Sequence, residues 1–249
     1  MTLGLGIIGI GKRWGHAGGE VPSEPDALNL LEFAWEIGIR YFDSAPSYGV
    51  AEERLGKFLR SLTADQRAEI QIATKFGEHW DAAREEPFVD HSFPALRRSL
   101  EASLLQLGRI DFLQLHKTSP EALRSEDVAR AWELAGQCGV GRIGASVSDL
   151  ESAEMVLADS RLRCIQLPLN AANPKFSHIV RRAANRDDLW VATNRPFAMG
   201  AMLYGEHPVS HADAFRSVLS HRFNGVVLTG TKSKQHLREN WDAFHSVTI

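Results

Sequence analysis

Residues 41–49 read Tyr-Phe-Asp-Ser-Ala-Pro-Ser-Tyr-Gly, and this stretch predicts a short buried strand that ends in a loop. The apolar residues before Asp43 supply the strand, whereas the proline and the glycine after it prevent its continuation. A carboxylate at the end of a buried strand is costly unless a cation neutralises it. The sequence therefore predicts a basic partner for Asp43, with the phenol of Tyr48 in the loop that follows.

Two later apolar runs also end in a titratable residue. Residues 70–75 end in Lys75, and residues 111–116 end in His116. The packing of a core does not require a titratable residue at the end of each of three strands. We therefore expect these strand ends to build one site, in which Lys75 is the counter-charge of Asp43.

The chain of 249 residues alternates such apolar runs with helical patterns. The expected strands cover residues 3–10, 39–43, 70–75, 109–116, 142–146, 164–169, 189–193 and 225–229. The expected helices cover residues 26–37, 51–62, 92–107, 125–139, 150–157, 177–185, 212–219 and 234–244. Asp26 is the expected cap of the first helix, and either Ser125 or Asp127 opens the fourth.

This alternation of strands and helices, with no segment left over, predicts a single (β/α)8 barrel, a TIM barrel, that occupies residues 1–249. The alternative is an open, doubly wound sheet, which would carry a glycine-rich phosphate-binding turn after its first strand. Here Gly4 and Gly6 lie inside the first expected strand instead. The barrel is therefore the better interpretation.

Composition narrows the class of protein. Apolar residues make up 44% of the chain and charged residues 24%, as in soluble globular enzymes. The net charge of −3 gives no reason to expect nucleic acid or an anionic membrane as partner. The two cysteines, Cys138 and Cys164, cannot form a disulfide framework. Since the sequence also shows neither a membrane-spanning segment nor a signal-peptide pattern, we expect a soluble, cytoplasmic protein.

The carboxyl ends of all strands in such a barrel face one shared mouth, which gathers the four titratable residues. A free tyrosine has a pKa of ~10, and a nearby ammonium lowers that pKa. Tyr48 beside Lys75 is then a proton donor for a developing alkoxide, and an imidazole can hydrogen-bond a carbonyl oxygen. A structural ion pair, a loop aromatic and a core histidine are the simpler interpretations. They are favoured for any one residue, but not for all four together.

The stretches FDSAPSYGVAEERLG (42–56), IATKFG (72–77) and LQLH (113–116) resemble the aldo-keto reductase family. The resemblance implies a (β/α)8 barrel that uses a nicotinamide dinucleotide, usually NADPH, with NADH possible. It implies that Tyr48 is the general acid, that Lys75 and Asp43 tune it, and that His116 orients the carbonyl group of the substrate.

The same resemblance assigns the cofactor contacts. Ser146 and Gln166, with Asn170 in the same pattern, match the positions that bind the nicotinamide carboxamide. The loop under the pyrophosphate would hold Arg195, Pro196, Phe197 and Gly200. The clamp on the adenosine phosphate would hold Gly230, Thr231, Lys232, Ser233, His236 and Asn240. His236 stands where many relatives have an arginine, so we expect a moderate preference for NADPH.

The chain also departs from the family. It begins at the first strand, without the hairpin that many relatives place before it, and it has no long C-terminal loop. The candidate aromatic residues of the substrate pocket are Trp14, Phe76 and Trp80. No metal site is expected, because Pro208 prevents the helix that would align His207 and His211.

These observations favour an NADPH-dependent reductase of a small aldehyde or ketone. An NAD-dependent dehydrogenase that oxidises a sugar is the first alternative, because the same four residues serve both directions. A nucleotide-sensing regulatory barrel is the second. The sequence leaves the substrate, the physiological direction and the oligomeric state open.

Overall fold

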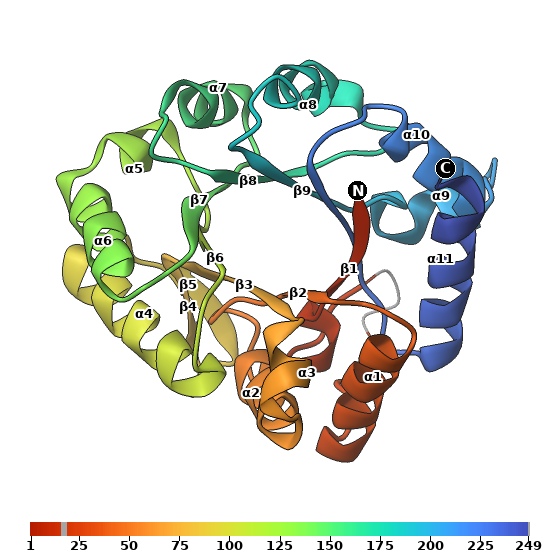
Figure 1. Ribbon diagram of the computed structural model, residues 1–249, viewed down its shortest axis with the longest axis horizontal. Coiled ribbons are helices and arrows are strands. Elements are labelled where there is room, and N and C mark those ends of the chain that lie inside the picture. The colour runs from red at the N-terminus through yellow and green to blue at the C-terminus, as the bar shows by residue number, and fades with distance from the viewer. Residues whose placement is uncertain (16–18, 249) are drawn as a thin grey trace.

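The computed structural model describes residues 1–15 and 19–248, and it shows a closed barrel of parallel strands surrounded by helices (Figure 1). Around the barrel the strands follow the order β1, β10, β9, β8, β7, β6, β3 and β2. β1 pairs in parallel with both β2 and β10, so the first and last strands of the chain close the ring. The expected (β/α)8 barrel is confirmed.

The barrel strands are β1 (Thr2–Gly6), β2 (Tyr41–Asp43), β3 (Gln71–Phe76), β6 (Phe112–Leu115), β7 (Arg142–Ser146), β8 (Cys164–Pro168), β9 (Trp190–Asn194) and β10 (Gly225–Thr229). The helices around them are α1 (Glu24–Glu36), α2 (Ala51–Ser61), α3 (Ala64–Ala68), α4 (Phe93–Leu107), α5 (Pro120–Arg124), α6 (Glu126–Gln137), α7 (Leu150–Ala158), α8 (Ser177–Ala183), α9 (Ala201–Tyr204), α10 (His211–Leu219) and α11 (Lys234–Val247). Short 3-10 helices are η1 (Ile8–Ile10), η2 (Pro174–Phe176) and η3 (Ala198–Gly200). In the described part of the chain, no helix is long and apolar enough to cross a membrane.

The first strand is shorter than the sequence predicted. β1 ends at Gly6, and residues 8–10 form η1, whereas one strand was expected over residues 3–10. A continuous apolar run does not distinguish a buried strand from a buried helical turn. The guanidinium of Arg54 donates a hydrogen bond to the carbonyl oxygen of Ile10 and so satisfies a buried acceptor that the turn leaves open.

The capping residue of α1 also differs from the prediction. Ser23, not Asp26, is the N-cap, and its Oγ accepts a hydrogen bond from the Asp26 amide at 3.3 Å. A serine two residues before a proline in the first turn is a strong helix start, and it outweighs the carboxylate of Asp26 as a cap. At α6 the cap is Ser125, the first of the two expected candidates.

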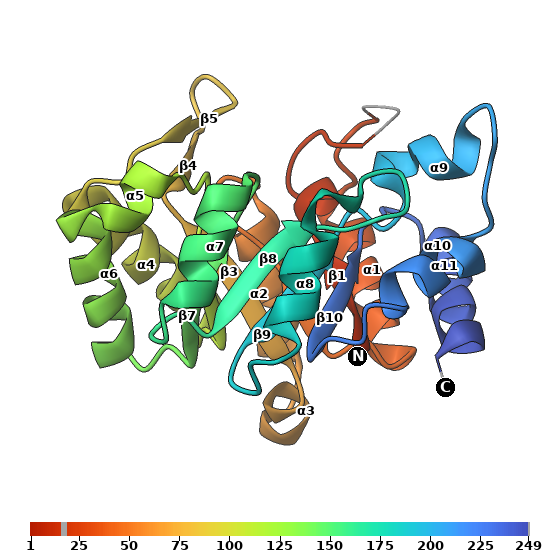
Figure 2. The same ribbon diagram turned by 90° about the horizontal axis from the view of Figure 1, so that it is seen from above.

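The connection over residues 76–91 holds an antiparallel hairpin that the sequence did not predict. Its strands are β4 (Glu78–Asp81) and β5 (Glu86–Val89), paired from Glu78 with Val89 to Asp81 with Glu86. The hairpin reads EHWD in β4 and EPFV in β5, and neither strand shows the apolar alternation that marks a half-buried strand. Figure 2 shows this hairpin, the loop after β1 and α9 at one end of the barrel, with both chain termini toward the opposite end.

The two faces of each barrel strand pack against different cores. Tyr41 and Ala73 belong to the apolar cluster inside the barrel, whereas Phe42 belongs to the larger cluster between the strands and the helices. Because successive side chains of a strand alternate between its faces, Asp43 on β2 and Lys75 on β3 return to the inside. They are the last such residues before each strand opens into the mouth of the barrel.

A carboxylate is buried on the outer side of the same strands. Glu52 on α2 is 8% exposed, and it accepts hydrogen bonds from Thr74 of β3 at 2.5 Å and Ser103 of α4 at 3.0 Å. These bonds join one strand to two helices directly behind Lys75. Burial raises the pKa of Glu52 to about 7, although the bonds from Thr74 and Ser103 lower it.

Since this pKa is higher in the folded than in the unfolded chain, Glu52 binds more protons in the folded state between pH 4.5 and about 7. The free energy of unfolding should therefore fall as pH rises through that window, by about 3 kcal/mol from this group. Glu52→Gln should flatten the pH dependence of stability, measured by denaturant unfolding between pH 5 and pH 8.

The matched control is Glu53→Gln. Glu53 is exposed, and its hydrogen bond from Lys57 lowers its pKa, so this variant should keep the wild-type fall in stability. Equal slopes for wild type and Glu52→Gln would contradict the role given to Glu52.

Candidate active site

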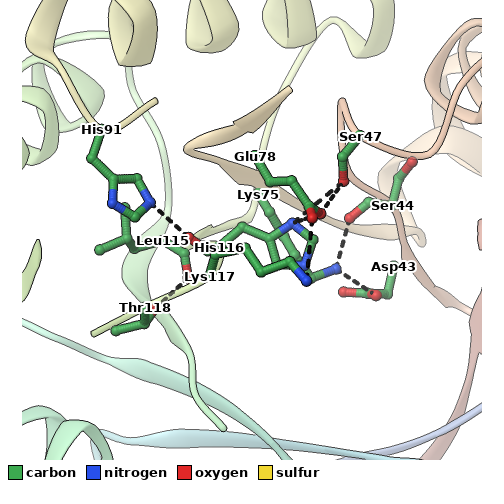
Figure 3. Close-up of polar contacts among 10 residues, drawn as sticks. All are labelled: Asp43, Ser44, Ser47, Lys75, Glu78, His91, Leu115, His116, Lys117 and Thr118. Atoms are coloured by element: carbon green, nitrogen blue, oxygen red, sulfur yellow. Dashed lines mark hydrogen bonds and ion pairs between the residues drawn. The ribbon is translucent and has the colours of Figure 1, made fainter. Parts of the chain in front are cut away.

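A buried ion pair stands at the mouth of the barrel. Lys75 donates hydrogen bonds from Nζ to Asp43 Oδ1 at 2.7 Å and to the carbonyl oxygen of Ser44 at 2.8 Å (Figure 3). The second carboxylate oxygen of Asp43 accepts a hydrogen bond from Gln166 Nε2 at 3.1 Å. Burial is the largest single effect and lowers the pKa of Lys75, but Asp43 and Tyr48 together outweigh it and raise that pKa, so the ammonium keeps its charge.

Tyr48 lies directly against this ammonium. The Nζ atom of Lys75 is 4.9 Å from the centre of the Tyr48 ring, and the ring of His116 meets it edge-on at 6.0 Å. Burial raises the pKa of Tyr48, and Lys75 opposes that effect without reversing it. The sequence led us to expect a lowered pKa, so the net direction is corrected here: the phenol keeps its proton and is a proton donor.

Glu78, the first residue of β4, holds the ring of His116. Glu78 Oε2 lies 3.0 Å from His116 Nδ1 and accepts a hydrogen bond from Ser47 Oγ at 2.6 Å (Figure 3). Glu78 Oε1 lies 3.3 Å from the ammonium of Lys117. The backbone of His116 is fixed as well, because His91 Nε2 donates to its carbonyl oxygen at 2.9 Å.

The carboxylate decides which nitrogen of His116 carries the proton. Burial, together with Lys75, Lys117 and Lys12, lowers the pKa of His116 well below its usual range, so the ring is neutral near pH 7. A neutral imidazole has one N–H, and a carboxylate 3.0 Å from Nδ1 keeps it there. Nε2 is then a hydrogen-bond acceptor, and it becomes a donor only in the imidazolium form.

A cavity of about 740 Å³ opens beside these side chains. Most residues singled out in the sequence line it: Trp14, Asp43, Tyr48, His116, Ser146, Gln166, Arg195, Pro196, Phe197, Gly200, Gly230, Thr231, Lys232, Ser233, His236 and Asn240. They follow strands that are distant in the chain, so the barrel brings them to one place.

Two expected site residues lie behind the lining. Lys75 is 1% exposed and acts on the cavity through Asp43 and Tyr48. Phe76 is wholly buried in the cluster between strands and helices, so its predicted place in the substrate pocket is wrong. It follows Lys75 on β3 and therefore faces the opposite side of the strand.

Asn170 and Trp80 support the site from outside the lining. Asn170 donates from Nδ2 to the carbonyl oxygen of Arg195 at 2.9 Å and accepts from the Asn173 amide at 2.9 Å. Its side chain thus holds the loop after β9 and does not line the cavity, whereas a contact with the cofactor was expected. Trp80 on β4 lies under the ammonium of Lys12, 5.3 Å from its ring centre.

Three of the lining residues that the sequence analysis does not predict are charged. Lys12, Glu78 and Lys117 all line the cavity. Glu78 and Lys117 come shortly after Lys75 and His116 in the chain, and that proximity was the available signal. Across the described ranges, no group of three or more His, Cys, Asp or Glu residues is arranged to hold a metal ion.

The model of the aldo/keto reductase family matches residues 2–217 of this chain. The chain belongs to this family. L-galactose dehydrogenase of Arabidopsis thaliana is 34% identical over 119 residues, which cover 46% of this chain and 34% of that protein. D-threo-aldose 1-dehydrogenase of a Pseudomonas species is 33% identical over 140 residues, which cover 46% and 39%. The matches thus span well under half of these two relatives.

Among solved structures, a putative aldo-keto reductase from Pseudomonas aeruginosa superposes with a TM-score of 0.83 at 25% identity. The superposition covers 98% of this chain and 89% of that one. The barrel and its helices are therefore those of an aldo-keto reductase throughout.

The far side of the cavity fits the nicotinamide dinucleotide that members of this family use. Asn240 donates from Nδ2 to Thr229 Oγ1 at 2.8 Å, while its buried Oδ1 has no hydrogen-bond partner within the described ranges. An amide oxygen in this state can accept a hydrogen bond from an amino group of a ligand. Ser233 caps α11 through the His236 amide, so the free amides of this helix start lie where a phosphate can bind.

The loop after β9 is shaped for an anion as well. Arg195, Ala198, Met199 and Gly200 all have positive φ, between 48° and 98°. Non-glycine residues rarely adopt this conformation, and when neighbours combine it with ordinary backbone their amides converge on anions. The strained conformation thus has a use if a pyrophosphate lies beside this loop.

Replacement of Glu78 by glutamine should lower the pKa of His116 further, because the imidazolium loses its counter-charge. Lys117→Met should raise the same pKa, because it removes a cation that lowers it. A proton NMR titration of the histidine ring follows both changes without any assay of activity. We expect the pKa of His116 to shift in opposite directions in the two variants.

An unchanged His116 titration in Glu78→Gln would show that the carboxylate does not control the imidazole. If both variants shift in the same direction, the opposite effects assigned to Glu78 and Lys117 are wrong.

Proposed function

We propose that this aldo-keto reductase uses NADPH to reduce the carbonyl group of a small aldehyde or ketone, with Tyr48 as general acid. The observation that carries the proposal is the phenol of Tyr48 at the cavity wall, backed by a buried ammonium whose own charge Asp43 maintains. A proton donor with a fixed cation behind it is suited to an oxygen that gains negative charge.

Ser146 and Gln166 line the cavity and would hold the nicotinamide, and the bound cofactor would supply a hydride to the carbonyl carbon, so that the C=O π electrons move to oxygen. Tyr48 gives its phenolic proton to that oxygen, and the product is the alcohol. Lys75 stabilises the phenolate that remains until solvent returns the proton. His116 lies beside Tyr48 and fixes the position of the oxygen, as an Nε2 donor when it is protonated.

Oxidation of a sugar hydroxyl with NAD is the second candidate, and one feature of the site favours it. In its neutral form His116 offers Nε2 as an acceptor, which matches a substrate hydroxyl better than a carbonyl oxygen. The similarity to L-galactose dehydrogenase and D-threo-aldose 1-dehydrogenase agrees with this direction. The same Tyr48 would then accept the proton that it donates in reduction.

Cofactor choice depends on the segment between β10 and α11. Lys232 lines the cavity, and its ammonium donates to the carbonyl oxygens of Gly19 at 2.9 Å and Glu20 at 3.0 Å. An ammonium has three N–H groups, so one stays available for the 2′-phosphate of NADPH. His236 cannot form the bidentate hydrogen bonds that an arginine makes to a phosphate. The expected preference for NADPH is therefore moderate.

Tyr48→Phe should lower kcat by ~100-fold or more, because the ring remains and only the proton donor is lost. The dissociation constant of the nucleotide, measured by fluorescence titration, should stay within about twofold. Carbonyl substrates with reduced cofactor and sugars with oxidised cofactor should be assayed side by side. A variant that keeps most of its activity in both directions would remove Tyr48 from the chemistry.

Lys232→Ala should raise KM for NADPH by roughly 10-fold, since one charge-assisted hydrogen bond to the 2′-phosphate is lost. KM for NADH should change much less. Lys234→Ala is the matched control, because Lys234 lies over the ring of Phe33, 5.6 Å from its centre, and away from the cavity. Equal effects of Lys232→Ala on both cofactors, or a wild type that prefers NADH, would favour the sugar dehydrogenase.

A further inference from the structure

One cation at the catalytic end of the cavity has no assigned task. Lys12 lies in the loop after η1, lines the cavity and is partly buried. Its Nζ atom is 5.8 Å from the centre of the Tyr48 ring and 5.3 Å from that of Trp80. Within residues 1–15 and 19–248, no oxygen accepts a hydrogen bond from this ammonium and no carboxylate lies within ion-pair distance.

The position of Lys12 is built into the backbone. The Val50 amide donates to the carbonyl oxygen of Gly11 at 3.3 Å, which joins the loop of Lys12 to the loop of Tyr48. A Cβ atom on Gly11 would lie 1.9 Å from the carbonyl oxygen of Tyr48, so no side chain fits there. The two loops therefore pack backbone against backbone, and Lys12 is held beside the phenol.

The charges around the phenol leave Lys12 in excess. Asp43 is neutralised by Lys75 at 2.7 Å, and Glu78 by Lys117 at 3.3 Å. Burial and the neighbouring lysines lower the pKa of His116, so its ring is neutral near pH 7. Among the described groups at this end of the cavity, one positive charge therefore remains, and it is that of Lys12.

An unpaired ammonium in a partly buried cavity is unfavourable until an anion meets it. Burial lowers the pKa of Lys12, and Glu78, which is already shared by two other groups, offsets only part of that effect. Trp14, two residues further along the same loop, also lines the cavity, and its aromatic ring suits the carbon part of a small molecule.

We propose that Lys12 binds an anionic group of the substrate, so that the enzyme acts on small carbonyl compounds that carry a carboxylate or a phosphate. The proposal rests on the proposed function and names the class of substrate for it. The anionic group and the reacting carbonyl group must lie within a small molecule's length of each other, because the ammonium of Lys12 is only 5.8 Å from the centre of the Tyr48 ring.

Paired substrates test this assignment. The carboxylate pairs are 3- and 4-formylbenzoate against the 3- and 4-formylbenzamides, which keep the size and the conjugation but not the charge. The phosphate pair is glyceraldehyde 3-phosphate against glyceraldehyde. For wild type with NADPH, we expect kcat/KM to be at least ~10-fold higher for the anion in one pair, which identifies the anionic group.

Lys12→Met should bring that ratio close to one, whereas Lys12→Arg should retain most of it. Arg13→Gln is the matched control, because it removes the same charge from the next residue in the chain. The side chain of Arg13 is exposed and lies outside the cavity lining. It should leave the ratio as in wild type. A preference that disappears equally in Arg13→Gln would mean general electrostatics and would overturn the proposal.

Binding of the reaction products, 3- and 4-(hydroxymethyl)benzoate and glycerol 3-phosphate, to the NADPH complex gives a readout without turnover, because NADPH cannot oxidise an alcohol. Isothermal titration of this complex should show dissociation constants ~10-fold weaker in Lys12→Met than in wild type. If no carbonyl is reduced but Lys12-dependent anion binding persists, the reductase proposal fails and the anion site stands. If neutral and anionic carbonyls are reduced equally by wild type and Lys12→Met, the reductase stands and the anion site fails.

Discussion

The ion pair of Asp43 and Lys75 is the interaction on which the rest of the site depends. Both side chains are almost fully buried, and separation of such a pair by removal of one partner costs about 3–5 kcal/mol. The pair is tolerated because every side of it is satisfied: Ser44 accepts from the ammonium, and Gln166 donates to the carboxylate. Tyr48 is held against a charge that cannot move away, and a fixed positive charge favours an anionic oxygen beside it.

Much of this arrangement follows from the sequence, because the residues that end each strand can be recognised in it. Asp43, Lys75 and His116 each end an apolar run, and a parallel barrel directs such ends to one mouth. Phe76 was misplaced for a reason that strand geometry explains: if Lys75 points inward, the next side chain must point outward. The alternation of side chains between the two faces of a strand therefore predicts which residues reach the site better than their aromatic character does.

The rest of the site could not be predicted because its signals lie in loops. Glu78 belongs to a hairpin with no apolar alternation, and Lys12 follows a run that reads as strand but folds as a helical turn. Neither residue belongs to a local sequence pattern that predicts which side chains it contacts. The tautomer of His116 depends on its contact with Glu78, and only the folded loops bring these two side chains together.

The closure of the barrel has a consequence for how this enzyme becomes active during folding. Gln166 and Asp43, joined by a hydrogen bond, are 123 positions apart, and the ring closes only when Thr2 of β1 pairs with Val226 of β10. Such distant contacts form late, because the chain must lose much of its freedom before they give any stability. A partly folded barrel would hold Asp43 near water and Lys75 without its full set of partners. Catalytic competence should therefore appear in one step with completion of the ring, and not gradually as strands are added.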